Sequence, residues 1–128
     1  MSLRVGIDLV SVAQVEDSIA AHGERYLSRV FSEEELSDSR GRPERLAARF
    51  AAKEAAMKAL GRGDEGFGWK SIEVKRADNG QPTLHLRGEA ARLAQRRGVE
   101  SFAVSLTHEH GHAAAVVLME TTHEHNIE

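Results

Sequence analysis

The sequence predicts an α+β fold in a single domain, and three features support this prediction. The 128 residues suit one domain of ordinary size with one core. Strand-like and helix-like patterns follow one another in mixed order, with no internal repeat or linker. Two strand patterns, near 70–76 and 83–87, flank a turn at 78–80 and predict a hairpin. We expect residues 1–120 to form the domain and 121–128 a flexible C-terminal tail.

The first half of the chain is predicted to begin with a strand that a helix follows directly. Residues 5–10 are mostly apolar and predict a buried strand. Ser11 can cap the following helix, which is expected to end at His22. Ser32 and Glu35 have the spacing of a capping box and predict a short second helix.

The longest predicted helix runs from Pro43 to Leu60. Proline is common in the first turn of a helix, and Gly61 stands just past the predicted end. A glycine-rich loop over 61–68 then leads to the hairpin. Short glycine loops after helices are usually simple turns, so Gly-x-Gly at 61–63 is a weak signal by itself.

The C-terminal part is predicted to contain a helix over 89–97 and two strands, near 101–108 and 112–119. The last strand is apolar on both faces, unlike a strand with one side in water. Because the core of so small a domain covers one face, the other needs a helix or a neighbouring subunit. We therefore expect a protomer interface near one or more of Ala113, Ala115 and Val117.

Composition excludes several classes of function. The chain has no cysteine, which excludes disulfides, thiolate zinc sites and a cysteine nucleophile. Its net charge of −3 argues against non-specific binding to nucleic acid. No apolar run approaches ~18 residues, and the start leads into a strand pattern rather than a signal peptide. We expect a cytoplasmic protein without a nucleic-acid or membrane partner.

Two carboxylates and a lysine are the first candidate site. Asp8 lies in an apolar strand, where a charge is costly to bury unless it is paired or binds a cation. Glu54 and Lys58 lie four residues apart at the edge of the long helix's apolar stripe. The alternatives are that Asp8 lies at the solvent end of its strand or caps the following helix, and that the Glu54–Lys58 pair merely stabilises its own helix. The surrounding alanines would let another backbone or a ligand approach closely.

A row of bases on the same helix is the second candidate. Arg45, Arg49 and Lys53 recur every four residues and lie within about 80° of one another around the helix. Residues 40–62 contain seven bases and two acids, so this segment attracts anions. A solvated helix face is one interpretation, and a surface for a phosphate-rich ligand is the other.

Histidines near the end of the chain are the third candidate. His108 has a side chain whose ordinary pKa suits proton transfer near neutrality. His108, His110 and His112 would share one face of an extended strand and could hold a transition metal. Gly111 interrupts that regularity, so simple surface polarity remains the stronger interpretation.

Four motifs together resemble the holo-acyl-carrier-protein synthase group of 4′-phosphopantetheinyl transferases. They are Gly6-Ile7-Asp8-Leu9-Val10, Arg49-Phe-Ala-Ala-Lys53-Glu54-Ala-x-x-Lys58-Ala-x-Gly61, Gly80-Gln-Pro82-x-Leu84 and Ser105-Leu-Thr-His108. Their order and spacing match that group over nearly the whole chain. The long middle motif is the most specific, and the glycine turn and the Ser-Leu-Thr-His end are weaker.

The resemblance implies a 4′-phosphopantetheinyl transferase fold, with a mostly antiparallel sheet packed on a long central helix. It also implies a homotrimer that binds coenzyme A between protomers. The reaction moves the phosphopantetheine arm of coenzyme A onto a serine of apo acyl-carrier protein and releases adenosine 3′,5′-bisphosphate. Asp8 and Glu54 match the group's Mg²⁺ positions, which suits a cation that prefers oxygen ligands. Lys58 would add a positive charge beside the diphosphate. For coenzyme A we expect contacts from Arg45, Arg49, Lys53, Gly61, Gly63 and Pro82.

Departures from the group's pattern leave two points open. Some relatives carry an acid after the Glu-Leu of the second helix, where this chain has Ser37. The general base is therefore either Glu54, acting through a water held at the metal, or His108. The first helix also lacks the bases that grip the acidic carrier in many relatives. We expect carrier recognition to shift to bases later in the chain, among Arg25, Arg29, Arg40 and Arg42.

Two other functions compete with the transferase. A non-catalytic module that binds coenzyme A or a metal would keep the basic helix without requiring both Asp8 and Glu54. A hydrolase of the coenzyme A diphosphate would release phosphopantetheine into solution without any carrier. Mass analysis of apo carrier protein incubated with coenzyme A and Mg²⁺ distinguishes all three.

Overall fold

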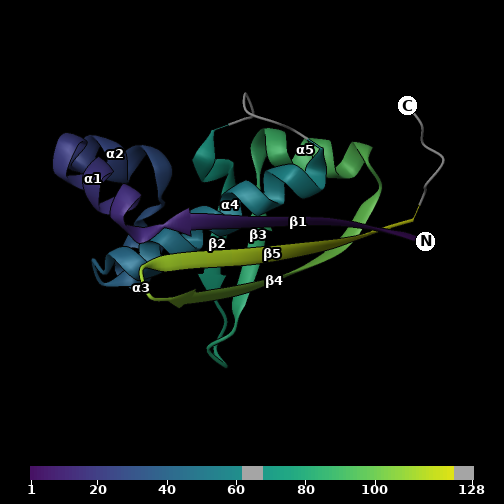
Figure 1. The fold of residues 1–128 in the computed structure, drawn as a ribbon. Coiled ribbons are helices and arrows are strands. Elements are labelled where there is room, and N and C mark those ends of the chain that lie inside the picture. Colours follow the sequence, from purple (N-terminus) through teal and green to yellow (C-terminus); the bar gives the residue numbers. More distant parts are fainter. Residues whose placement is uncertain (62–67, 123–128) are drawn as a thin grey trace.

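The chain folds as a three-stranded antiparallel sheet with a long helix against one face and a separate hairpin (Figure 1). The computed structural model describes residues 1–61 and 68–122. The strand order is β1–β5–β4, with bounds Ser2–Ser11, His112–Thr121 and Val99–Glu109. The hairpin pairs β2, Ile72–Arg76, with β3, Pro82–Leu86, also antiparallel. The predicted α+β class and hairpin are confirmed.

Local signals in the sequence position most of the helices. Within the described residues these are α1 (Val12–His22), α2 (Glu24–Val30), α3 (Glu33–Ser39), α4 (Pro43–Leu60), α5 (Gly88–Arg96) and the 3₁₀ turn η1 (Trp69–Ser71). The Ser11 side chain accepts the Gln14 N–H at the start of α1. Ser32 and Glu35 form the predicted capping box of α3. The predicted bounds of α4 are confirmed as well.

The structure differs from the predicted elements in three places. Gly23, at φ 55°, ends α1. The next residue begins α2, a helix that the sequence pattern did not predict. β1 starts at Ser2 rather than at residue 5. The strand expected near 70–76 starts at Ile72, because the residues before it form η1.

Close contact between β1 and α4 sets the geometry of the fold. A Cβ atom built on Gly6 would lie 1.9 Å from the Ala55 carbonyl oxygen, so only glycine permits this approach. The alanines of α4 are buried for the same reason. They let a second backbone approach, which was one of the two interpretations of the Ala-rich pattern. The contact brings Asp8, two residues after Gly6, beside α4.

The two faces of the sheet have different neighbours, although both are apolar. The inner face of β5 is buried in the core at Ala113, Ala115 and Val117, each 3% exposed or less. The prediction that these residues form a protomer interface is therefore wrong. The outer face carries six large apolar side chains that remain exposed by 38–68%: Leu3, Val5, Ile7, Leu9, Val116 and Leu118. This set is called the outer apolar face below.

Both ends of the described chain meet on the sheet. Ser2 on β1 is paired with Thr121 on β5, and their hydroxyl oxygens are 2.7 Å apart. Residue 121 therefore belongs to a strand, and residues 123–128 of the predicted tail lie outside the described residues. Over residues 1–61 and 68–122, no helix combines the length and apolarity needed to cross a membrane.

Candidate active site

The contact between β1 and α4 brings three of the predicted residues together. Asp8 projects from β1 with a side chain 13% exposed, and Glu54 and Lys58 come from the adjoining part of α4. The Lys58 ammonium donates to Asp8 Oδ1 at 3.0 Å and to the Ile7 carbonyl oxygen at 3.2 Å. These three groups are called the carboxylate site below. Lys58 therefore bridges to the strand, and its pairing with Asp8 rules out the purely intrahelical alternative.

The surroundings of Glu54, Asp8 among them, change the ionisation of its carboxyl group. Burial raises the pKa of Glu54 to about 7, helped by a hydrogen bond with Asp8 and by the negative charge of Asp8. The positive charge of Lys58 opposes this shift. A carboxyl group with so high a pKa lacks enough positive charge nearby to stabilise its ionised form.

The oxygen atoms of this pair fit a hard divalent cation. Mg²⁺ is commonly bound by one or two carboxylates, with substrate phosphates and water as its other ligands. Among the described residues, no group of three or more His, Asp or Glu side chains converges on one point. Asp8 and Glu54 would thus supply only part of the coordination and leave the rest to a phosphate-bearing ligand.

A second group of predicted residues meets at the other side of α4. Arg45, Arg49 and His108 line a cavity of about 200 Å³, together with Asp38 and Arg76. This is called the basic cavity below. Its walls come from α3, α4, the end of β2 and β4. Arg45 and Arg49 are brought together as predicted, and His108 joins them rather than the carboxylate site.

Arg49 is the most buried cation of the basic cavity. Arg49 is 7% exposed, and its Nε has no hydrogen-bond partner among the described residues. Oδ2 of Asp38, in the same cavity, also has no partner there. Burial lowers the pKa of Arg49, whereas the charges of Asp38 and Glu35 oppose that shift. An enclosed guanidinium with an unused donor, in a cavity with two further arginines, suits an anion such as a phosphate.

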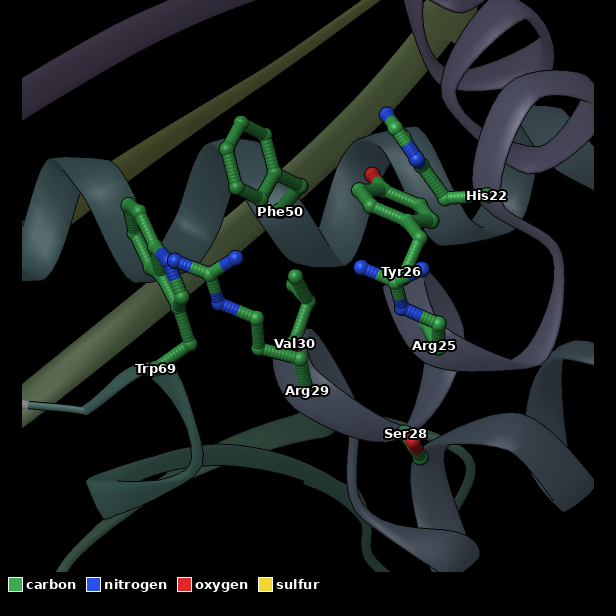
Figure 2. Close-up of a pocket in the computed structure, with 8 residues that line it drawn as sticks. All are labelled: His22, Arg25, Tyr26, Ser28, Arg29, Val30, Phe50 and Trp69. Atoms are coloured by element: carbon green, nitrogen blue, oxygen red, sulfur yellow. The ribbon is translucent and has the colours of Figure 1, made fainter.

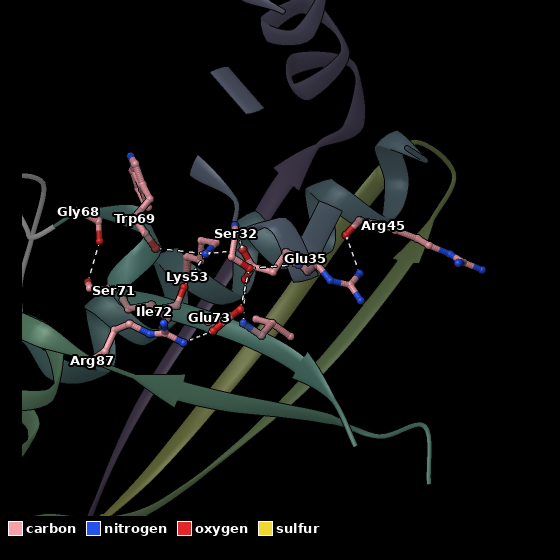
Figure 3. Close-up of polar contacts among 12 residues, drawn as sticks. Ser32, Glu35, Arg45, Lys53, Gly68, Trp69, Ser71, Ile72, Glu73 and Arg87 are labelled. Atoms are coloured by element: carbon pink, nitrogen blue, oxygen red, sulfur yellow. Dashed lines mark hydrogen bonds and ion pairs between the residues drawn. The ribbon is translucent and has the colours of Figure 1, made fainter. Parts of the chain in front are cut away.

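Lys53 does not share this surface. Its ammonium is fully buried, pairs with Glu35 at 2.9 Å and donates to the carbonyl oxygens of Trp69 and Ile72 at 3.2 and 2.5 Å (Figure 3). Burial lowers the pKa of Lys53, and Glu35 opposes this shift. The predicted three-base row is therefore wrong at Lys53. Positions four apart differ in direction by about 40° around a helix. Over the eight residues from Arg45 to Lys53 the side chains therefore rotate from the surface into the core.

Other predicted coenzyme A contacts lie at the edges of these features. Gly61 ends α4 at φ 84°, and an added Cβ would meet the Arg4 side chain at 2.9 Å. Pro82 begins β3 opposite Arg76, which lines the basic cavity. Gly63 lies outside the described residues.

The alternative of a three-histidine metal site is contradicted. His110, at φ 51°, and Gly111, at φ 79°, form the turn between β4 and β5. His108 and His112 lie on different strands that run in opposite directions. The three side chains therefore do not share one strand face, as the break at Gly111 indicated.

The structure also contains a larger cavity that no pattern in the sequence predicts. This cavity, of about 490 Å³, is lined by His22, Arg25, Tyr26, Ser28, Arg29, Val30, Phe50 and Trp69 (Figure 2). It is called the aromatic cavity below. Arg25 and Arg29 were singled out from the sequence, but the aromatic side chains were not. A neighbouring hollow of about 330 Å³ shares Tyr26 and Phe50 and extends along α1 to Asp17.

Comparisons with known proteins identify the family of the chain. The family model of the 4′-phosphopantetheinyl transferase superfamily matches residues 4–117. The holo-[acyl-carrier-protein] synthase of Moorella thermoacetica is 46% identical over 123 residues, which cover 94% of this chain and 95% of the relative. That of Anaeromyxobacter sp. is 47% identical over 128 residues, covering 95% and 98%.

Solved structures give the same result for the fold. The Helicobacter pylori holo-[acyl-carrier-protein] synthase in complex with coenzyme A matches with a TM-score of 0.82 and 28% identity, covering 91% of this chain and 99% of that one. The Mycobacterium tuberculosis acyl carrier protein synthase matches with a TM-score of 0.75 and 34% identity, covering 93% and 97%. The chain therefore belongs to the 4′-phosphopantetheinyl transferase superfamily and, within it, to the holo-[acyl-carrier-protein] synthase group.

Proposed function

We propose that this protein transfers the 4′-phosphopantetheine group of coenzyme A to a serine of apo acyl-carrier protein, in a Mg²⁺-dependent reaction in the cytoplasm. The observation that carries the proposal is the carboxylate site, where Asp8, Glu54 and Lys58 meet between β1 and α4. In the reaction, the serine oxygen attacks the phosphorus that bears the pantetheine arm. The P–O bond of the diphosphate breaks, and adenosine 3′,5′-bisphosphate leaves.

Each residue of the carboxylate site has a proposed role. Asp8 and Glu54 would hold Mg²⁺, which polarises the diphosphate and offsets its developing charge. Lys58 lies 3.0 Å from Asp8 and adds a positive charge on the same side. Of the two candidate bases, Glu54 lies within this site, whereas His108 lies in the basic cavity. This separation favours a phosphate contact for His108 and proton transfer near Glu54.

The basic cavity is the proposed site for the 3′-phosphate of coenzyme A. It combines the unused donor of Arg49 with the side chains of Arg45 and Arg76. Pro82, paired with Arg76, lies beside this cavity and is a proposed contact for the nucleotide. Gly61, at the end of α4, is also a proposed contact of coenzyme A, as is Gly63, which lies outside the described residues.

The aromatic cavity is the proposed docking place for the carrier protein. Its bases, Arg25 and Arg29, suit an acidic partner, and Tyr26, Phe50 and Trp69 provide an apolar surface between them. The expected shift of recognition away from the first helix agrees with Asp17 lining the neighbouring hollow on α1. Arg40 and Arg42 are exposed before α4 and remain available as secondary contacts.

A homotrimer with shared active sites is the proposed assembly. The outer apolar face leaves six large side chains exposed, which is unusual for a monomer. The carboxylate site lies along the β1 edge of the sheet, and the basic cavity lies along the β4 edge. Joining the β1 edge of one protomer to the β4 edge of the next would bring both groups to one coenzyme A. Such head-to-tail contacts close into a ring of three when each protomer is rotated by a third of a turn from the last.

Intact-mass analysis of apo carrier protein is the direct test of this function. With coenzyme A and Mg²⁺, the carrier should gain the mass of one phosphopantetheine group. Hydrolysis of coenzyme A without a mass gain would instead indicate the diphosphate hydrolase. Binding of coenzyme A without any turnover would indicate the non-catalytic module.

Coenzyme A lacking its 3′-phosphate should bind more weakly to the wild type, because the basic cavity would then be only partly filled. Replacing Arg49 with Ala should shrink this preference to about a tenth or less, since a charge-assisted hydrogen bond contributes ~1.5–3 kcal/mol. Isothermal titration calorimetry with coenzyme A and with coenzyme A lacking its 3′-phosphate measures this preference as a ratio of the two dissociation constants. Arg92→Ala, on the exposed face of α5, is the matched control. An unchanged preference in both Arg45→Ala and Arg49→Ala would show that these bases are only a solvated face.

Metal binding is tested separately by melting temperatures at several pH values. The pKa of Glu54 rises from an ordinary 4.5 to about 7 in the folded protein, so the folded state keeps a proton that the unfolded state loses. Stability therefore falls as pH rises through this window. Glu54→Gln should melt at the same temperature as wild type at pH 4 and at a higher one at pH 8. Mg²⁺ at pH 8 should stabilise only the wild type, and equal stabilisation of both proteins would contradict the assignment.

A further inference from the structure

Lys53, which the sequence placed on a ligand-binding surface, lies instead beneath the aromatic cavity. All three hydrogen-bond partners of its ammonium belong to the protein: Glu35 Oε1 and the carbonyl oxygens of Trp69 and Ile72. An ammonium group has three N–H donors. All three N–H donors of Lys53 are therefore occupied by partners within the fold, and none is left for a substrate.

The partner of Lys53 is itself held rigidly. Glu35 is fully buried and also accepts the N–H groups of Ser32 at 2.9 Å and Val74 at 2.8 Å. The Ser32 hydroxyl donates to Glu73 Oε2 at 2.7 Å, and Glu73 pairs with Arg87 (Figure 3). This network ties α3, α4 and β2 together around one buried ammonium. Because every member is paired, the network favours a single arrangement of these elements.

The walls of the aromatic cavity rest on the same lysine. Trp69, whose carbonyl oxygen Lys53 holds, packs its ring on Phe50 with the centroids 4.9 Å apart. On the other side, the Lys53 ammonium lies 5.9 Å from the ring centroid of Phe31, which packs edge-on against Tyr26 at 6.0 Å. Tyr26, Phe50 and Trp69 all line the cavity (Figure 2). One side chain thus supports both aromatic walls from below.

We propose that Lys53 is a positioning residue for the carrier protein, because its ammonium fixes the turn that carries Trp69 and so keeps the aromatic cavity formed before the carrier arrives. This inference rests on the proposed function, in which the cavity receives the carrier. A surface that is already ordered loses less conformational entropy on binding. Loss of Lys53 should therefore raise the KM for the carrier, while kcat at saturating carrier and the KM for coenzyme A stay within about twofold of wild type.

The double variant Lys53→Met/Glu35→Gln is the sharpest test. Lys53→Met alone leaves the Glu35 carboxylate buried and unpaired, which can prevent folding. The double variant removes both charges, keeps the side chains close to their original size and leaves an amide oxygen to accept one of the N–H groups. Arg87→Met is the matched control, because it removes a cation from the same network but keeps the backbone N–H of residue 87, which donates to the Ser71 carbonyl oxygen of the Trp69 turn.

Trp69 provides a readout that needs no enzymatic activity, since it is the only tryptophan of the chain. In the double variant, its fluorescence emission should shift to longer wavelength, and acrylamide should quench it more strongly. The KM for the carrier should rise about fivefold or more, corresponding to a loss of about 1 kcal/mol of binding. Arg87→Met should leave the emission and both KM values close to wild type.

The outcomes separate this inference from the proposed function. A folded double variant with wild-type emission and wild-type carrier KM overturns it, as does a changed emission with an unchanged carrier KM. A rise in the KM for coenzyme A, with no rise in that for the carrier, would also overturn it and indicate that Lys53 contributes to binding coenzyme A. The same changes in Arg87→Met would indicate general loosening of the network. If the wild type transfers nothing to any carrier, the proposed function fails, whereas the emission still reports whether Lys53 fixes the turn.

Discussion

Replacing Asp8 with Asn, or Glu54 with Gln, is expected to lower phosphopantetheine transfer at least about a hundredfold while the protein stays folded. A cation held beside a diphosphate contributes several kcal/mol to the transition state, and each ~1.4 kcal/mol changes the rate tenfold. Both replacements keep the size of the side chain, so neither creates a cavity. Initial rates from intact-mass analysis over a range of Mg²⁺ concentrations measure the effect.

Glu44→Gln is the matched control for these two variants. Glu44 lies in the first turn of α4, on the same helix as Glu54, and outside the carboxylate site. Its replacement changes the net charge by the same amount and should leave transfer within about twofold of wild type. Near-normal turnover of Asp8→Asn or Glu54→Gln at limiting Mg²⁺ would refute the assignment of the metal site. A circular dichroism spectrum identical to wild type shows that the variants are folded.

Replacing Leu118 with Asp should dissociate the assembly and abolish activity together. Leu118 belongs to the outer apolar face and is 43% exposed in the isolated chain, so a charge there is tolerated by the protomer. At a buried interface the same charge would be unpaired and costly. Sedimentation velocity and transfer rates on the same samples test this. Gln95→Asp on α5 is the control. A fully active monomer at assay concentration would contradict the proposal that protomers share active sites.

Mixing two variants that are each impaired at limiting coenzyme A tests the shared site without disturbing the interface. If one protomer supplies Glu54 and its neighbour supplies Arg49, then Glu54→Gln and Arg49→Ala protomers complement each other when they are refolded together. Random rings should recover about one quarter of the wild-type sites, because two neighbours must each carry the intact half. No recovery at limiting coenzyme A would place both residues in one protomer's site.

The sequence predicted best those elements whose signals are local. Ser32 and Glu35 satisfy each other across one helical turn, and Pro43 and Gly61 mark the two ends of α4. Asp8 was also found, because a charge within an apolar strand requires an explanation that does not depend on the rest of the fold. α2 was missed because Gly23 both ends one helix and precedes another, and no side chain caps the second.

The remaining wrong predictions concern which residues are buried, and this depends on tertiary contacts that the sequence pattern does not show. The inner and outer residues of β5 are equally apolar in the sequence, so the pattern alone does not show which set faces α4. Lys53 has the same spacing as Arg45 and Arg49, and its burial depends on Glu35, a residue 18 positions earlier whose visible role was helix capping. The aromatic cavity unites α2, α4 and η1, which no local pattern connects.

The contact at Gly6 also affects how substitutions in this protein are interpreted. Any side chain there would collide with the Ala55 carbonyl and push β1 away from α4, separating Asp8 from Glu54. In a scan of all single substitutions selected for activity, position 6 should tolerate as little change as the two carboxylates do. A position with no functional group would then rank among the catalytic ones. The sensitivity of position 6 reflects how closely the backbones of β1 and α4 approach each other. The chemistry of the side chains alone does not predict this constraint.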